Sequence, residues 1–266
     1  MCLLYRILRK VIDINSSAED RRNQIIEILK EKKKVKVAEL KDIFNVSGVT
    51  IGADLNYFER KGYIERSFGY ALLKDNSSIF TGDIDKDNFE HKKRIAKTAA
   101  KYIGDNESIM FYTGSTVLYV ARQLKDVKNF IAVTNSTQIA QELGIKPNVK
   151  TILLGGFYNP ENYSSFGGQA IKQLSEYNID KVIMSANGIS AKDGLTIDQP
   201  FETDLNREVI KKAKMKIIVA DHTKIGVSRF IKIAAINDID VLITDENAPE
   251  EEVCKIREAG VEVILA

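Results

Sequence analysis

The sequence predicts an α/β protein with a winged helix-turn-helix at its N-terminal end and a larger α/β body after it. Between residues 35 and 73, two helix-like segments are followed by a pair of short strands. From about residue 89 onward, short apolar runs alternate with amphipathic segments, a pattern typical of a sheet covered by helices on both faces. The 266 residues are enough for two domains of ordinary size.

The winged unit is predicted from the places where its helical patterns begin and end. Apolar residues recur at helical spacing from Val37 to Phe44, and the next two residues interrupt this pattern. Ser47 can cap a second helix, which then runs to the helix stop Gly62. Strands at residues 63–66 and 70–73 follow. A unit of this kind lays its second helix in a DNA major groove while the hairpin touches the backbone.

The segment before this unit is predicted to hold a first helix from residue 18 to about 32, opened by acidic residues as the helix dipole favours. Lys32, Lys33, Lys34 and Lys36 are then expected to form a basic turn. Such a run fits either a solvated face or a set of contacts to DNA phosphates, which position a protein without reading bases. Residues 1–17 form an extension, interpreted as a dimer arm or as an accessory leader.

The α/β body is predicted to span residues 89–266, after a winged domain at 18–73 and a polar linker at 74–88. We expect helices at residues 89–102, 116–124, 137–143, 165–176, 203–212 and 250–259. We expect strands at residues 108–111, 130–133, 149–154, 181–184, 216–220, 241–244 and 261–264. The glycine patterns of dinucleotide-binding and P-loop proteins do not occur.

Composition and charge limit the class of protein. Residues 1–73 hold 14 Lys+Arg against 10 Asp+Glu, whereas the rest holds 25 against 27. A mildly basic N-terminal module suits DNA binding, although so small an excess is also common by accident. Cys2 and Cys254 are far apart and form no metal or disulfide pattern, so we expect a reducing compartment. The apolar run at residues 3–8 is too short to span a membrane, and the sequence predicts a cytoplasmic protein with no membrane partner.

Polar turns follow five of the predicted strands, and in a parallel sheet such turns meet at one edge, where ligands bind. The turn from Thr113 to Thr116 opens a helix, so its N–H groups and hydroxyls can cradle an anion; the alternative is an ordinary capped turn. Lys224 would supply the cation, unless it is a solvated surface lysine. His222 is interpreted as a cap or a structural polar group. The candidate effector-binding residues are Gly114, Ser115, Thr116, Thr134, Asn135, Ser136, Gly155, Gly156, Asn187, Gly188, Asp221 and Lys224.

Taken together, these motifs resemble the DeoR family of bacterial transcription regulators. In the winged unit the resemblance is carried by the Val37–Leu40 segment, Val46–Ser47, Thr50–Ile51, Asp54–Leu55 and the Gly62-x-Ile64-x-Arg66 ending. In the body it is carried by Gly114-Ser115-Thr116, Thr134-Asn135-Ser136, Leu154-Gly155-Gly156, residues 180–188, Gly194-Leu195-Thr196, Arg207, residues 220–226 and Ile243-Thr244-Asp245. It implies a sensor domain similar in fold to ribose-5-phosphate isomerases and CoA transferases, which binds a phosphorylated sugar that modulates DNA binding.

Two positions depart from the family pattern. Gly52 and Ala53 stand where members usually carry two arginines, so the second helix lacks its strongest phosphate and guanine ligands. Tyr112 stands where the family often has an aspartate, which alters a contact to the sugar.

We therefore expect a DNA-binding repressor of carbohydrate-metabolism genes, acting on double-stranded DNA as a homodimer or homotetramer. No catalytic residue, metal or cofactor is expected. The expected DNA contacts are Lys36, Ser47, Thr50, Arg60, Lys61 and Arg66. Two alternatives stay open: a sugar-phosphate isomerase that uses the same edge of the sheet, and a regulator that has lost DNA recognition through Gly52 and Ala53.

Overall fold

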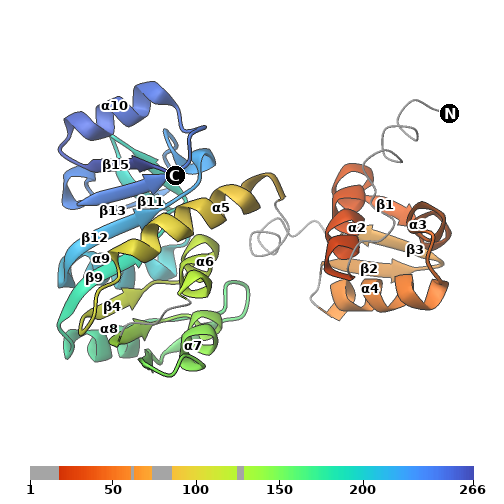
Figure 1. The fold of residues 1–266 in the computed structure, drawn as a ribbon, viewed down its shortest axis with the longest axis horizontal. Coiled ribbons are helices and arrows are strands. Elements are labelled where there is room, and N and C mark those ends of the chain that lie inside the picture. Colours follow the sequence, from red (N-terminus) through yellow and green to blue (C-terminus); the bar gives the residue numbers. More distant parts are fainter. Residues whose placement is uncertain (1–17, 61–62, 74–85, 125–128) are drawn as a thin grey trace. The chain divides into compact units, whose positions relative to one another are not determined.

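The computed structural model describes residues 18–60, 63–73, 86–124 and 129–266 (Figure 1). The chain divides into two compact units, Met1–Lys86 and Asp87–Ala266. Helix α5 (Lys86–Ala99) takes up the last three residues of the predicted linker, so the body begins slightly earlier than predicted. The predicted extension at residues 1–17 lies outside the described residues.

In its described residues, the first unit, which we call the winged domain, has three helices and a three-stranded antiparallel sheet in the order β1-β3-β2. Its helices are α2 (Ala18–Lys32), α3 (Val37–Phe44) and α4 (Gly48–Arg60), and its strands are β1 (Lys34–Lys36), β2 (Ile64–Ser67) and β3 (Tyr70–Leu73). Between α3 and α4, Asn45 adopts the left-handed conformation with φ 49°, which ends α3 and turns the chain. The predicted helix-turn-helix is therefore present.

One expectation for this domain was wrong. The lysine-rich segment after α2 is not only a turn, because Lys34–Lys36 pairs with β3 as a third strand. Val35 is buried and its two lysine neighbours are exposed, which is the alternation that a half-buried strand requires. The hairpin between β2 and β3 turns through Phe68 and Gly69, both at positive φ, as a tight two-residue turn demands.

The core of the winged domain is an apolar cluster that joins all three helices to the sheet. Helix α4 also contributes a buried ion pair next to this apolar cluster. Asp54, 1% exposed, accepts hydrogen bonds from Nε of Arg21 at 2.6 Å and from Nε of Arg22 at 2.8 Å. Because both arginines belong to α2, this carboxylate ties the second helix of the motif to the first helix of the domain.

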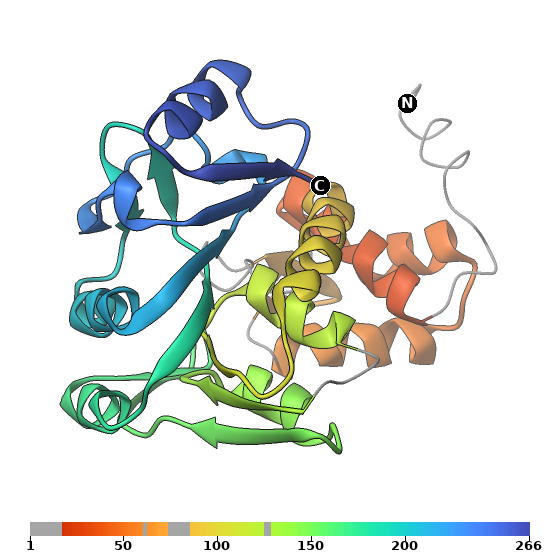
Figure 2. The same ribbon diagram turned by 60° about the vertical axis from the view of Figure 1, so that its left-hand side comes forward.

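The second unit is built on a seven-stranded sheet in which every neighbouring pair is parallel. The strand order is β15-β14-β12-β9-β4-β5-β6, so β9 and β4 lie near the centre (Figures 1 and 2). The strands are β4 (Ser108–Phe111), β5 (Phe130–Thr134), β6 (Val149–Leu153), β9 (Ile179–Met184), β12 (Ala213–Val219), β14 (Val241–Thr244) and β15 (Glu262–Leu265).

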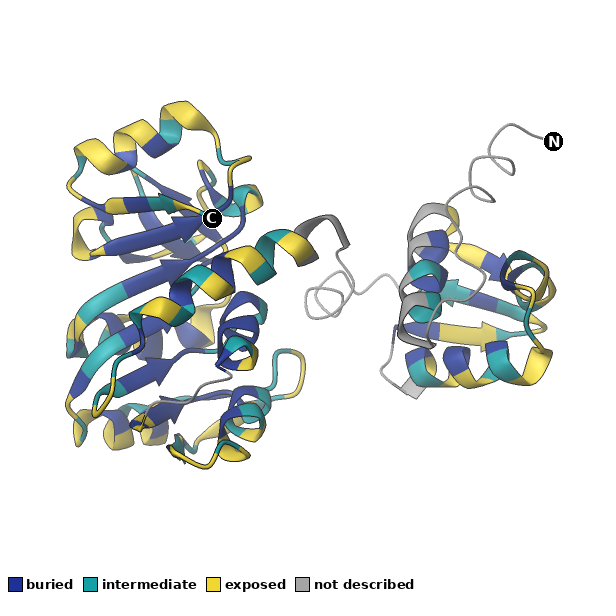
Figure 3. Ribbon diagram, viewed as in Figure 1, coloured by how far each residue is buried: buried dark blue, intermediate teal, exposed yellow. Residues whose placement is uncertain are grey.

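Helices cover both faces of this sheet, and each face has its own apolar cluster. Helices α5, α6 (Ser115–Gln123) and α7 (Thr137–Gly144) pack on one face. Helices α8 (Gly168–Ser175), α9 (Thr203–Lys212) and α10 (Glu250–Glu258) pack on the other. Successive residues of a strand alternate between the two clusters, as Ile109, Met110 and Phe111 do in β4. This explains why the central strands β4, β9 and β12 are apolar on both faces and buried in their carboxyl-terminal halves (Figure 3).

Three smaller features were not expected from the sequence. Strand β10 (Gly188–Ser190), strand β11 (Gly194–Ile197) and strand β13 (Ile231–Ala234) form an antiparallel sheet of their own. Strand β7 (Phe157–Asn159) pairs with β8 (Ser164–Phe166), so the predicted helix at residues 165–176 was wrong at its start. Short 3-10 helices occur at η2 (Ala100–Tyr102), η3 (Pro200–Glu202), η4 (His222–Lys224) and η5 (Ile236–Asp238).

Among the described residues, we find no helix whose length and apolar character would let it cross a membrane.

Candidate functional site

The carboxyl ends of the seven strands meet at one edge of the parallel sheet. The polar turns singled out from the sequence follow β4, β5, β6, β9 and β12, so the sheet brings all five to this edge. We call the edge the effector rim and define it by the residues directly after these five strands. The N-termini of the helices that return from the strands also lie here, where backbone N–H groups favour an anion.

At the centre of the effector rim, Gly114 turns the chain from β4 into α6. Its φ is 152°, in the region that favours glycine, and no side chain of the described residues caps the first turn of α6. A Cβ placed on Gly114 would lie 3.7 Å from the Cβ of Ser185, in the loop after β9. Ser115 and Ser185, both partly exposed, therefore lie close to a helix start whose N–H groups receive no side-chain cap from the described residues. Thr116 is buried within α6.

The turn after β5 does not present free side chains. Thr134, Asn135 and Ser136 are each no more than 2% exposed. The Asn135 amide oxygen accepts from the N–H of Thr113 at 2.9 Å, and its amide nitrogen donates to the carbonyl of Ser165 at 3.1 Å. Thr134 accepts from the N–H of Ser136, and Ser136 caps α7. These side chains hold the effector rim in shape rather than offering polar atoms to a ligand.

Glycines after β6 and β9 are explained by close backbone approaches. A Cβ on Gly156 would lie 2.3 Å from the carbonyl oxygen of Phe166, and one on Gly188 would lie 2.4 Å from that of Val227. Gly155 donates its N–H to the side chain of Gln173 at 2.8 Å. These contacts give the three glycines structural roles at the effector rim. Asn187, which directly precedes Gly188, is exposed.

The turn after β12 carries the predicted cation. Asp221, 3% exposed, accepts from the N–H of Thr223 at 3.1 Å and so caps η4. Lys224, the last residue of η4, is partly exposed, and among the described residues no hydrogen bond or ion pair of its ammonium group is found. Strand β9 separates β12 from β4, so the ends of these two strands lie about two strand spacings, or about 10 Å, apart.

Tyr112, one of the two departures from the family pattern, does not reach the rim. Its side chain is 2% exposed and packs in the apolar cluster beneath α8 and α9. Its hydroxyl accepts a hydrogen bond from Asn206 at 2.9 Å. Burial, together with the nearby Glu202 carboxylate, raises the pKa of Tyr112 well above its ordinary value, so the phenol is neutral. A buried tyrosine therefore fills the position where the family often has an aspartate.

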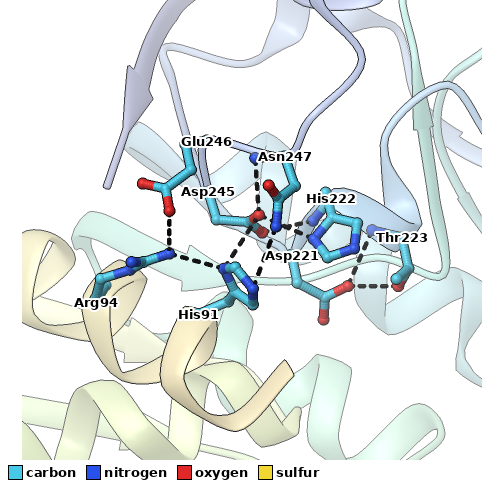
Figure 4. Close-up of polar contacts among 8 residues, drawn as sticks. All are labelled: His91, Arg94, Asp221, His222, Thr223, Asp245, Glu246 and Asn247. Carbon is cyan, nitrogen blue, oxygen red and sulfur yellow. Dashed lines mark hydrogen bonds and ion pairs between the residues drawn. The ribbon is translucent and has the colours of Figure 1, made fainter. Parts of the chain in front are cut away.

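Three residues that the sequence analysis did not single out also lie at this edge. Ser185 faces Gly114, and its only sequence signal is its place directly after an apolar strand. Exposed Arg229 approaches the carbonyl of Asn187 at 3.4 Å and brings a second cation to the effector rim. His91, on α5, contacts Asp245 after β14, a pairing between distant parts of the sequence that no local pattern indicates (Figure 4).

In the winged domain, α4 presents a small and weakly polar outer face. Val49 is 84% exposed, Ala53 and Asn56 are also exposed, and these positions share one side of the helix. A Cβ on Gly52 would meet nothing within 4 Å, so that side is open. At the start of the helix, Ser47 accepts from the N–H of Thr50 at 3.1 Å, and their hydroxyls lie 2.8 Å apart.

The predicted phosphate contacts fall in different parts of this domain. Arg66, exposed on β2, donates from Nη1 to the Asn56 side chain at 2.5 Å. Lys36 is exposed at the end of β1, and its ammonium lies 5.7 Å from the centre of the Tyr70 ring. Arg60 ends α4, but its side chain, like the whole of Lys61, lies outside the described residues.

Comparison with known proteins agrees with this architecture. Residues 21–77 match the model of the DeoR-like helix-turn-helix domain, and residues 87–246 match that of the DeoR C terminal sensor domain. The chain is 33% identical to the HTH-type transcriptional regulator GolR of Listeria innocua, over 93% of this chain and 98% of that protein. It is 31% identical to the HTH-type transcriptional repressor GlcR of Bacillus subtilis, over 93% and 96% of the two chains.

Solved structures of lower similarity include ribose 5-phosphate isomerase A from Neisseria gonorrhoeae, 20% identical with a TM-score of 0.39 over 53% of this chain and 55% of that chain. The two family models together cover both domains, and the relatives match along nearly their full lengths. The chain thus belongs to the DeoR family of transcriptional regulators.

Proposed function

We propose that this protein is a transcriptional repressor of carbohydrate-metabolism genes whose DNA affinity is controlled by a phosphorylated sugar bound at the effector rim. The observation that carries the proposal is the start of α6. A glycine turn, with Ser115 and Ser185 beside it, precedes N–H groups that no side chain of the described residues caps. Lys224, in the turn after β12, has no described partner, and β12 is two strands from β4.

This arrangement suits a phosphate joined to a polyol. A phosphate group accepts hydrogen bonds from the first N–H groups of α6 and from the hydroxyl of Ser115, and the helix dipole adds to its binding. A sugar attached to such a phosphate would extend along the effector rim from β4 past β9 toward the turn after β12. Lys224 and Arg229 then neutralise the charge at the other end of the site or contact the sugar hydroxyls.

On the DNA side, we infer that α4 enters the major groove. Without arginines at positions 52 and 53, its outer face offers Val49 and Ala53, whose apolar groups suit thymine methyl groups. Lys36 and Arg66 would contact phosphates on either side. This predicts an operator rich in A·T pairs at the positions that α4 reads, and an affinity that depends strongly on salt.

A dimer or tetramer follows from the size of the contact surface. A single winged domain buries too little surface for specific operator binding, so two copies are needed to span two half-sites. We propose that such an oligomer acts in the cytoplasm, where it meets both DNA and phosphorylated metabolites.

Fluorescence anisotropy with the full-length protein tests the proposal. A labelled promoter fragment from beside the protein's own gene is titrated at two salt concentrations, with and without pentose and hexose phosphates. We expect sub-micromolar binding that one sugar phosphate changes by at least about fivefold, the lower end of ordinary allosteric coupling. Binding that no sugar phosphate alters would contradict the effector assignment. No binding even at low salt would instead indicate that DNA recognition has been lost. Turnover of a sugar phosphate would support the alternative, an isomerase.

A further inference from the structure

Both histidines of the sequence, His91 and His222, lie side by side although they are far apart along the chain (Figure 4). His91 belongs to α5, on one face of the large sheet, and His222 opens η4 after β12. Their ring centres are 5.3 Å apart and the rings meet edge to face. With only two histidines in 266 residues, their meeting at one point needs a physical explanation.

A carboxylate lies between the two rings. Oδ1 of Asp245, which follows β14, is 2.9 Å from Nδ1 of His222 and 3.3 Å from Nδ1 of His91. Asp245 is fully buried, whereas the side chains of His91 and His222 are 17% and 28% exposed. The cluster is therefore buried on its carboxylate side and partly exposed on its histidine side.

Neighbouring groups hold the Asp245 carboxylate in one orientation. Oδ2 accepts from the backbone N–H of His222 at 2.8 Å, and Oδ1 accepts from the backbone N–H of Asn247 at 3.1 Å. Such backbone contacts are typical of the groups that orient metal ligands.

Three polar groups surround the ring nitrogens of His91, whose Nε2 lies 3.3 Å from the amide nitrogen of Asn247. Its Nδ1 faces Asp245 at 3.3 Å and also Nη2 of Arg94 at 2.9 Å. With Nδ1 protonated, the ring donates to the carboxylate and accepts from Asn247 at Nε2, and only the Arg94 contact is opposed. With Nδ1 unprotonated, the ring accepts from Arg94 but sets a lone pair against the carboxylate. A cation between Nδ1 and Oδ1 would satisfy both lone pairs, and Arg94 would keep its bond to Glu246 at 2.8 Å.

We propose that His91, His222 and Asp245 bind a divalent transition-metal ion, with Zn²⁺ as the best match. Their ligand atoms all lie within 4.8 Å of one another. A tetrahedral ion with bonds of about 2.1 Å needs ligand separations of about 3.4 Å, so small rotations of the two rings suffice. Two imidazoles and one carboxylate are ligands that zinc and neighbouring first-row metals accept. Three protein ligands leave a fourth position for water on the open side.

The ion would connect three elements of the second unit: α5, η4 and β14. Helix α5 is the first helix of this unit, and η4 ends at Lys224, the cation proposed for the effector. Metal binding therefore fastens α5 to the turn that also carries an effector contact. This site is separate from the phosphate-binding turn at Gly114, so it goes beyond the proposed function.

The test measures metal binding directly, without DNA or effector. Full-length protein with Cys2→Ser and Cys254→Ser, which removes both thiols as competing ligands, is freed of metal with a chelator. Zn²⁺ is then titrated by calorimetry, and Co²⁺ by its visible absorption. We expect one ion per chain, with an affinity that His91→Gln and His222→Gln each weaken by more than about 100-fold, beyond the 10- to 100-fold typical of residues that only orient ligands.

Arg94 and Glu246 provide the matched variants. Arg94→Gln removes a group that competes for Nδ1 of His91, so it should tighten Zn²⁺ binding. If the cluster has only a structural role, the same substitution should loosen its hydrogen bonds without any gain in Zn²⁺ affinity. Glu246→Gln changes an exposed partner of Arg94 and should alter the Zn²⁺ affinity by less than about tenfold. Far-ultraviolet circular dichroism of each metal-free variant establishes that it is folded. Weak binding that is equal in the parent and both histidine variants would overturn the proposal, even if effector binding at the rim is confirmed.

Discussion

Arg66 in the wing donates from Nη1 to Oδ1 of Asn56 on α4, at 2.5 Å. The hairpin is thereby fixed against the outer face of the helix that we place in the major groove. Because Arg66 is exposed, its remaining guanidinium N–H groups are free to contact a phosphate.

Arg66→Ala should weaken DNA binding without changing which sequence is preferred. Removal of one phosphate contact lowers the affinity about uniformly across sequences and reduces the slope of log K against log salt by about 1. Anisotropy titrations over a salt series provide the measurement. Lys101→Ala, which removes an exposed charge from the second unit, is the matched control and should leave the slope unchanged. An unaltered slope in Arg66→Ala would exclude Arg66 as a phosphate contact.

Gly52 is expected to be tolerant of larger side chains. A Cβ there meets nothing within 4 Å and the backbone is helical, so Gly52→Ala should raise the stability of the winged domain by about 1 kcal/mol. Thermal or urea unfolding measures this change. The double variant Gly52→Arg with Ala53→Arg should go further and tighten DNA binding. If affinity for DNA does not rise in that variant, positions 52 and 53 do not face the duplex.

Asp54 is expected to hold the winged domain together. Asp54→Asn would leave Arg21 and Arg22 facing a neutral amide, and the loss of one partner from a buried ion pair costs about 3 kcal/mol. The free energy of unfolding, followed in urea, should fall by this amount. Glu39→Gln, which breaks the exposed pair with Lys32, should cost less than about 1 kcal/mol. Equal effects of the two substitutions would contradict the role assigned to the buried carboxylate.

The lowered pKa of Asp180 predicts how the stability of the folded protein changes at acidic pH. Hydrogen bonds from Lys214 and from Ser108 lower the pKa of Asp180 from 3.8 to about 2. Because the pKa is lower in the folded state, the stabilisation is complete above pH 3.8 and is lost as the pH falls toward 2. Asp180→Asn should therefore unfold at a lower temperature than the parent at pH 7, and this difference should narrow between about pH 4 and pH 2. A difference that stays constant over this range would exclude the ionised carboxylate as its source.

Much of this architecture could be predicted from the sequence because local signals dominate it. Asn45 and Ser47 mark the helix-turn-helix through backbone conformation and capping, and apolar runs mark the strands of a sheet that is buried on both faces. The meeting of five polar turns at one edge followed from the parallel order of the strands. The first two signals lie within short segments of the sequence, and the third follows from the general geometry of parallel sheets.

The rest depends on contacts that short segments do not encode. Lys34–Lys36 is a strand only because β3 pairs with it, and Ser164–Phe166 is a strand only because β7 does. Polar residues such as Asn135 and Thr134 are predicted from the sequence to contact an effector. Their complete burial, and the contact of Asn135 with Ser165 in β8, are visible only in the folded chain. The contact between His91 and Asp245 likewise joins residues that no spacing rule relates.

The central claim, that a charged metabolite at the effector rim controls DNA binding, is tested most directly by measuring the linkage in both directions. The dissociation constant for DNA is measured with and without the sugar phosphate, and that for the sugar phosphate with and without DNA, in the parent, Lys224→Ala and the control Lys211→Ala. Thermodynamics requires both ratios to be the same factor, expected here between about 5 and 150. We predict that the two ratios agree with each other in the parent, and that Lys211→Ala gives the same values as the parent. In Lys224→Ala, we predict that both ratios are near 1 while the affinity for DNA in the absence of sugar phosphate is unchanged. A sugar phosphate that binds equally well with and without DNA, or a full response in Lys224→Ala, would contradict the account.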